Sequence, residues 1–216
     1  MPSPTAPKPT VVLMVRHGAT PTTGQVLPGR APGLHLADRG HTQAKRAAER
    51  IAALKKPRAV AVYASPMERT QETAAPIGAA LELDVITDDG LLEADFGSWT
   101  GRKLSELMKL PEWTTVQRYP SGFRFPEGES FVEMQRRICT TIQGLVARHP
   151  GETIVVVSHA DPIKAAVADA LGTHLDLFQR IIIGPCSISA VSYTPTGPAV
   201  LGVNSTGDDL ADLVPG

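Results

Sequence analysis

Short apolar runs alternate with longer segments of helical periodicity along most of this chain. The runs are rich in Val, Ile and Ala, and their length predicts strands at 11–15, 59–63, 85–86, 153–157, 191–193 and 199–201. Apolar residues spaced three and four apart predict helices at 38–54, 67–81, 103–109, 130–148 and 162–171. The last two strands flank Pro195–Pro198 and indicate a terminal hairpin.

Two of these helices have well-defined inward faces. The first buries Ala44, Ala47, Ala48, Ile51 and Leu54, and the fourth buries Phe131, Met134, Ile138, Ile142 and Leu145. Strands that alternate with helices predict an α/β fold, a three-layer α/β/α sandwich with a mostly parallel central sheet and helices on both faces.

One domain accounts for nearly the whole chain. We expect a disordered leader at 1–9, which holds four prolines, a single domain at 10–204, and a flexible tail at 205–216. Segment 88–129 is too long for a plain connection, so we expect it to form a cap or lid over a functional site.

Composition narrows the class of protein. The chain has 216 residues, 42% of them hydrophobic, and a formal net charge of −1. The sequence has no basic stripe of the kind that binds nucleic acid, and no apolar run has the roughly 20 residues of a membrane span. We therefore expect a cytoplasmic protein whose partner is a small molecule. Cys139 and Cys186 lack the spacing of metal ligands and are expected to be buried free thiols.

The first strand delivers Arg16, His17 and Gly18 to its carboxyl end. Ligands of open α/β sheets bind at that edge. An imidazole is a good nucleophile toward phosphorus, an arginine can pair with phosphate oxygens, and a glycine allows an anion to approach the backbone. A histidine that merely closes a strand is the alternative.

Two further strands end in polar residues of the same kind. Arg69 follows strand 59–63 in the first turn of a helix, where an anion is favoured. The alternative is a solvated arginine paired with Glu68 or Glu72. His159 follows strand 153–157 and could donate to a phosphoryl group, or it could be a structural histidine.

An acidic residue stands in a loop rich in aromatic residues and glycine. Phe96 and Trp99 would shield the carboxyl of Glu93, which would raise its pKa and suit it to protonate a leaving oxygen. Asp95 competes for this role, and a surface acid is the alternative for both.

These elements, in this order, resemble the histidine phosphatase superfamily, also called phosphoglycerate mutase-like, over residues 11–204. The matching motifs are Arg16-His17-Gly18, Leu36 through Gly40 to Gln43-Ala44, Ser65 with Arg69 and Thr73, Glu93 through Gly97 with Trp99 and Gly101, Gly128-Glu129-Ser130, and Ser158-His159.

The resemblance implies a metal-independent reaction without a cofactor, in which His17 is phosphorylated. Arg16, Arg69 and His159 would surround the phosphoryl group, and Glu93 would be the proton donor. It also implies that the substrate is bordered by Gly18, Thr20, Thr23, Gly29, Arg30 and Ala160. Thr23 and Ala160 depart from the family pattern, which has asparagine and glycine there, and Arg30 is either a substrate contact or solvent-exposed.

Three functions fit this pattern. A phosphatase of small phosphate monoesters is preferred, because the arginines of the cap, Arg102, Arg118 and Arg124, are scattered, and the adjacent Arg136-Arg137 is expected on a solvated helix face. A phosphoglycerate mutase is the second candidate, and a phosphate-binding regulatory module with little turnover is the third. His35, His41, His149 and His174 are expected to be solvated or structural. The natural substrate and the oligomeric state stay open, a homodimer among the options.

Overall fold

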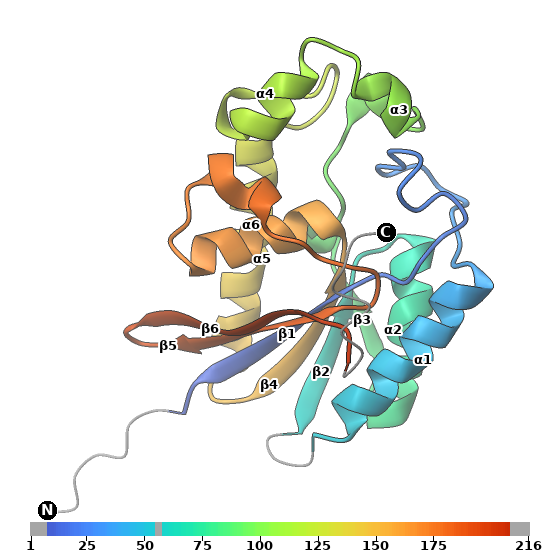
Figure 1. Cartoon of the computed structure of the whole chain (residues 1–216). Helices are drawn as coiled ribbons and strands as arrows, with labels where there is room; N and C mark the ends of the chain where they lie inside the picture. Colours follow the sequence, from blue (N-terminus) through green and yellow to red (C-terminus); the bar gives the residue numbers. More distant parts are fainter. Residues whose placement is uncertain (1–7, 55–57, 208–216) are drawn as a thin grey trace, which may run out of the picture.

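The structure is a computed structural model that describes residues 8–54 and 58–207 (Figure 1). Most of the predicted leader and tail therefore lies outside the described residues. The strands are β1 (Thr10–Arg16), β2 (Ala59–Ala64), β3 (Val85–Thr87), β4 (Thr153–Ser158), β5 (Ile188–Thr194) and β6 (Gly197–Ser205). The helices are α1 (Asp38–Ala52), α2 (Glu68–Leu81), α3 (Leu104–Leu107), α4 (Trp113–Arg118), α5 (Phe131–Arg148) and α6 (Ala160–Ala170).

One mixed sheet forms the middle layer, in the order β3-β2-β4-β1-β5-β6. The four strands β3, β2, β4 and β1 are parallel, and β5 and β6 are antiparallel additions at one side. Every residue of β4 is buried, because helices cover both faces of this central strand. The predicted fold class is confirmed.

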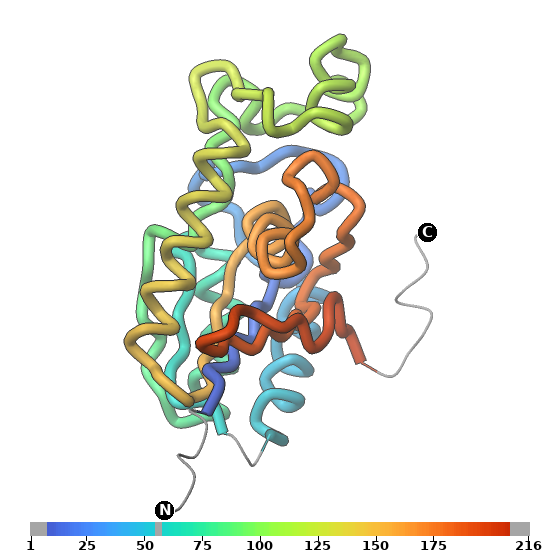
Figure 2. Tube along the Cα trace, turned by 90° about the vertical axis from the view of Figure 1, so that its left-hand side faces the viewer, coloured from blue at the N-terminus to red at the C-terminus, as the bar shows by residue number. Residues whose placement is uncertain are grey.

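Alternate residues of β1 face opposite helical layers. Val12 and Met14 belong to the core formed with α5, α6 and the cap, whereas Leu13 and Val15 belong to the core formed with α1 and α2. Figure 1 shows these two helical layers on opposite sides of the sheet, and Figure 2 shows the segment with α3 and α4 above them. Among the described helices, none is both long and apolar enough to cross a membrane.

Several local predictions differ from the structure. The periodicity predicts Leu54 on the inward face of α1, but the helix ends at Ala52 and Leu54 is 43% exposed. The cap holds a second helix, α4, that the apolar pattern does not mark, and four short 3-10 turns lie at Asp89–Leu91, Gly97–Trp99, Pro120–Gly122 and Leu175–Arg180. Strand β6 runs to Ser205, where the Arg50 guanidinium donates to the Ser205 carbonyl oxygen at 2.9 Å.

The aromatic residues of the cap form a core of their own. Trp99 lies 5.5 Å from Phe123 and 5.6 Å from Phe125 between ring centroids, and Phe125 lies 5.1 Å from Phe131 at the start of α5. These contacts anchor the cap segment, residues 88–129, to the body of the protein. Because the anchor is apolar and buried, the cap is held in place above the carboxyl ends of the parallel strands.

Candidate active site

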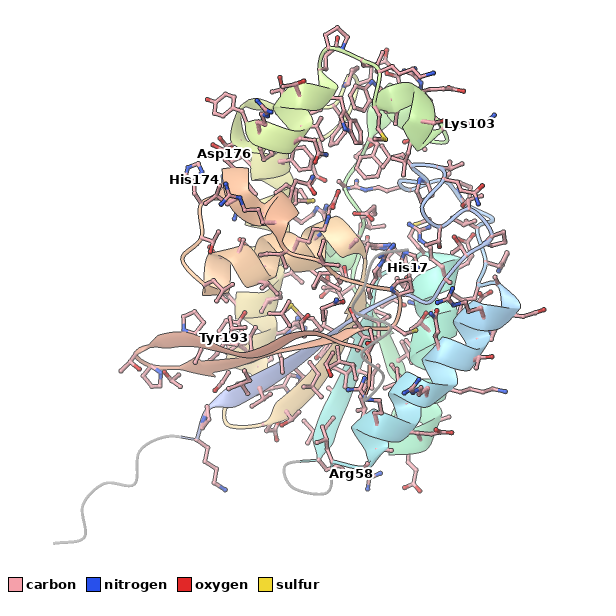
Figure 3. The ribbon with its side chains drawn as sticks, viewed as in Figure 1. His17, Arg58, Lys103, His174, Asp176 and Tyr193 are labelled. Atoms are coloured by element: carbon pink, nitrogen blue, oxygen red, sulfur yellow. The ribbon has the colours of Figure 1, made fainter. Side chains whose placement is uncertain are left out.

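A cleft of about 330 Å³ opens at the carboxyl end of β1, beside the start of α6 and below the cap. Its charged or titratable lining residues are Arg16, His17, Glu93, Asp161 and Lys164. The rest of the lining includes Thr20, Thr22, Thr23, Val26, Leu27, Pro28, Phe96, Leu104, Ala160, Ile182 and Ile183. Figure 3 shows His17 where the strands end, between the two helical layers.

The backbone fixes His17 and its tautomer. Its amide donates to the Ser158 carbonyl oxygen at 2.9 Å, which ties the end of β1 to the end of β4. Its Nδ1 lies 2.8 Å from the Gly18 carbonyl oxygen. A carbonyl oxygen only accepts, so the neutral ring carries its proton on Nδ1 and leaves the Nε2 lone pair free.

The surroundings of His17 keep it neutral. Burial, followed by the positive charges of Arg16 and Arg69, holds the pKa of His17 well below its usual value. A neutral imidazole with a free Nε2 is the form that can attack phosphorus.

Arg16 and Arg69 present hydrogen-bond donors that find no acceptor within the described part of the chain. Arg16 Nη1 donates to the Ile183 carbonyl oxygen at 2.7 Å, and Arg69 Nη2 donates to that of Gly29 at 2.7 Å. The remaining buried donors, Arg16 Nε with Arg69 Nε and Nη1, have no partner among the described residues. Of the two arginines, Arg16 lines the cleft, whereas Arg69 lies buried and is not among the lining residues. Buried donors without acceptors are costly, so an oxyanion that accepts from them is favoured here.

The solvated alternative for Arg69 is wrong. Its side chain is completely buried. The two acids considered as its partners contact the loop before α1 instead. Glu68 accepts from the Gly33 amide at 2.8 Å, and Glu72 accepts from the Leu36 amide at 2.8 Å.

His159 packs edge-to-face against His17, with 5.3 Å between the ring centroids, and is fully buried. Arg69 Nη2 lies 3.2 Å from its Nδ1, and because a guanidinium only donates, Nδ1 is the acceptor. Its Nε2 therefore carries the proton and donates to Ser65 Oγ at 2.9 Å. In this arrangement His159 orients Arg69 and does not line the cleft.

Glu93 is a buried carboxyl at the edge of the cleft. Burial first, and the negative charge of Asp161 second, raise the pKa of Glu93 to about 7, against the opposing influence of Arg69 and Arg16. The sequence predicts a raised pKa for Glu93, and the structure gives the same direction. Of the two aromatic residues expected to shield the carboxyl, Phe96 lines the cleft, whereas Trp99 packs inside the cap. Asp95 is 44% exposed and accepts from the Gly97 amide at 3.0 Å, so it is not placed to compete with Glu93.

Two arginines hold the backbone of Glu93. Arg30 Nε donates to the Glu93 carbonyl oxygen at 2.8 Å, and Arg137 Nη2 donates to the same atom at 3.3 Å. Glu129 accepts from both arginines, at 3.0 Å and 2.8 Å. The prediction that Arg137 is solvated is wrong, whereas its neighbour Arg136 is exposed as expected.

Some of the residues expected to border the substrate line the cleft in the structure, and others do not. Thr20, Thr23 and Ala160 line the cleft, and Thr23 Oγ1 accepts from the Thr20 amide at 2.8 Å. Gly18, Gly29 and Arg30 do not line it.

Each of these three residues has a supporting part instead. The Gly18 amide donates to Thr73 Oγ1 at 3.0 Å, and a Cβ at Gly18 would lie 2.7 Å from the Gly40 carbonyl oxygen, so the glycine allows α1 to pack closely. Gly29 holds Arg69 through its carbonyl group, and Arg30 holds Glu93.

Some residues of the site carry no sequence signal of their own. Asp161 and Lys164 line the cleft from the first two turns of α6, but a lone Asp or Lys on a helix is ordinary. Arg137 could have been found, because helical periodicity puts it only about 60° around α5 from the buried Met134, whereas Arg136 lies about 160° away.

Comparisons with known proteins identify the family of this chain. The family model of the histidine phosphatase superfamily (branch 1) matches residues 12–206. The chain belongs to the histidine phosphatase superfamily. It is 31% identical over 191 residues to phosphoserine phosphatase 1 of Hydrogenobacter thermophilus, covering 82% of this chain and 85% of that protein.

Other relatives differ in length or in degree of identity. The bifunctional protein Rv2228c of Mycobacterium tuberculosis is 34% identical over 216 residues, which are 95% of this chain, and the match spans 58% of that longer protein. A solved phosphoserine phosphatase of Entamoeba histolytica, a mutant in complex with phosphoserine, superposes with a TM-score of 0.81 at 25% identity, over 91% of this chain and 98% of that one.

Proposed function

We propose that this histidine phosphatase family member hydrolyses small phosphate monoesters without a metal, through a phosphohistidine on His17. The observation that carries the proposal concerns residues 8–54 and 58–207: within them, His17 Nε2 is not engaged in a hydrogen bond, and three buried guanidinium nitrogens of Arg16 and Arg69 have no acceptor. A phosphoryl group at this position would accept from Arg16 and Arg69 while His17 attacks it.

The proposed reaction proceeds in two steps. In the first, His17 Nε2 bonds to phosphorus, the bond from phosphorus to the ester oxygen breaks, and the Glu93 carboxyl gives its proton to the departing oxygen. In the second, the Glu93 carboxylate takes a proton from water, the water oxygen bonds to phosphorus, and the bond from phosphorus to Nε2 breaks. A Glu93 pKa near 7 allows both roles at neutral pH.

Phosphatase activity is favoured over mutase activity by the charges of the cleft. The cap arginines Arg102, Arg118 and Arg124 do not line the cleft, so they are not placed to hold a glycerate carboxylate. Transfer to water is therefore the better-supported outcome, and return of the phosphoryl group to a glycerate phosphate is the second candidate.

The test is phosphate release from an aryl phosphate in the presence of EDTA. We expect the wild type to release phosphate and to form an acid-labile, base-stable phosphoprotein on rapid quenching, and we expect His17→Ala to do neither. Full turnover by His17→Ala would refute the mechanism. Tight vanadate binding by the wild type without turnover would identify a phosphate-binding module instead.

A further inference from the structure

Two charged side chains of the cleft are not assigned a contact with the phosphoryl group in the mechanism proposed above, although the charge of Asp161 helps to raise the pKa of Glu93. Asp161 and Lys164 stand one turn apart on α6, and their side chains are 18% and 16% exposed. Lys164 Nζ lies 3.2 Å from Asp161 Oδ1 and donates to Gln179 Oε1 at 3.0 Å. One ammonium proton and one carboxylate oxygen of the pair therefore have no hydrogen-bond partner among the described residues, and Lys164 Nζ also lies 5.8 Å from the centroid of the Phe178 ring.

The pair stands where the leaving group must lie. The phosphoryl end of the cleft is defined by Arg16 and His17, and Asp161 and Lys164 line the same cavity. Apart from Glu93, the proposed proton donor, and the threonine hydroxyls, the other walls are largely apolar, with Leu27, Phe96, Leu104 and Ile182 among them. A polar leaving group thus finds its charged partners at this pair.

The pair discriminates by charge. A leaving group that bears only a carboxylate meets the repulsion of Asp161, and one that bears only an ammonium meets that of Lys164. A group that carries both on one carbon can lie antiparallel to the pair and satisfy each charge. Hydrogen bonds between charged partners are about twice as strong as neutral ones, so this match outweighs that of a neutral polyol.

We propose that the pair of Asp161 and Lys164 is a leaving-group subsite that selects phosphate esters of small zwitterionic alcohols, with the ammonium on Asp161 and the carboxylate on Lys164. The inference rests on the proposed phosphatase function. Asp161 and Lys164 are then the residues by which this chain discriminates between the phosphate ester of an amino acid and that of a glycerate.

Four small phosphate esters differ mainly in the groups that the subsite would contact. Phosphoserine carries both charges, phosphoethanolamine only the ammonium, 3-phosphoglycerate only the carboxylate, and glycerol 3-phosphate neither. We measure kcat/KM of the full chain for each, divided by its value for an aryl phosphate. We expect phosphoserine to exceed glycerol 3-phosphate by roughly tenfold or more.

Two variants test the assignment of each charge. Asp161→Asn should lower the relative kcat/KM of phosphoserine and phosphoethanolamine by roughly 10- to 100-fold and raise that of 3-phosphoglycerate. Lys164→Gln should lower the relative kcat/KM of phosphoserine and 3-phosphoglycerate but not that of phosphoethanolamine. Asp169→Asn, at an exposed position later on the same helix and outside the cleft, is the matched control and should change no ratio.

The outcomes separate the two proposals. Equal losses on all four esters in Asp161→Asn, or no preference of the wild type for phosphoserine, would overturn the subsite while aryl phosphate turnover still supports the phosphatase. A loss on glycerol 3-phosphate as large as that on phosphoethanolamine would show that Asp161 binds hydroxyl groups, and it would also overturn the zwitterion. Failure of the phosphatase proposal would show instead as no aryl phosphate turnover.

Discussion

Replacement of Glu93 by glutamine should weaken catalysis and stabilise the fold at the same time. Glu93 is 7% exposed, and burial together with the charge of Asp161 raises the pKa of its carboxyl from 4.5 to about 7. The folded protein therefore binds this proton more tightly than the unfolded chain does. Its ionisation opposes folding, and this cost appears as the pH rises above 4.5 and is complete above about 7.

The size of the effect follows from the two pKa values. At 1.36 kcal/mol for each pKa unit, a change from 4.5 to about 7 corresponds to about 3 kcal/mol in the free energy of unfolding. Glutamine has nearly the same shape and does not titrate. The stability of Glu93→Gln relative to the wild type should therefore rise by up to about 3 kcal/mol between pH 5 and pH 8.

Thermal or urea unfolding at pH 5, 6, 7 and 8, in buffers free of phosphate, measures this difference. In a chain of this length about 3 kcal/mol corresponds to roughly 6–12 °C in Tm. Turnover of an alkyl phosphate by the same variant should fall by roughly 10²- to 10⁴-fold, the usual contribution of a general acid.

Asp95→Asn is the control, because the Asp95 side chain is 44% exposed, its 3.9 Å ion pair with Arg30 is long, and its amide analogue can still accept from the Gly97 amide. A stability difference between Glu93→Gln and the wild type that stays constant from pH 5 to pH 8 would refute the reasoning. An equal pH-dependent gain in Asp95→Asn would assign the effect to the loop and not to the burial of Glu93.

Two other predictions concern the same carboxyl and its support. For an alkyl phosphate, kcat/KM should fall as the pH rises above about 7, since Glu93 must keep its proton to act as the acid; a flat profile from pH 6 to pH 9 would contradict this. Arg137→Met removes donors to the carbonyl groups of Gly90, Leu92 and Glu93, so it should lower the free energy of unfolding by about 2–3 kcal/mol and also reduce turnover. Arg136→Met, on the exposed face, should change the free energy of unfolding by less than about 0.5 kcal/mol. Chemical denaturation of the two variants side by side measures the difference, and equal losses would show that Arg137 is not the specific support of Glu93.

Local chemistry in the sequence determined the architecture and the position of the proposed nucleophile. The alternation of short apolar runs with helical periodicity predicts the layers, because each pattern has its own spacing and each element buries one face. Parallel strands end at one edge of the sheet, so His17 at the end of β1 is predicted near the end of β4 without knowledge of any side-chain position.

Only the tertiary structure decided how the long side chains are used. Arg30 and Arg137 converge on the Glu93 carbonyl oxygen from 63 and 44 positions away in the chain. Asp161 and Lys164 look like ordinary helix residues until α6 is packed beside the cleft. The reason is physical, because the period of a helix or strand fixes the direction of Cβ, whereas the contacts of a flexible arginine or lysine depend on which distant segment lies within its reach.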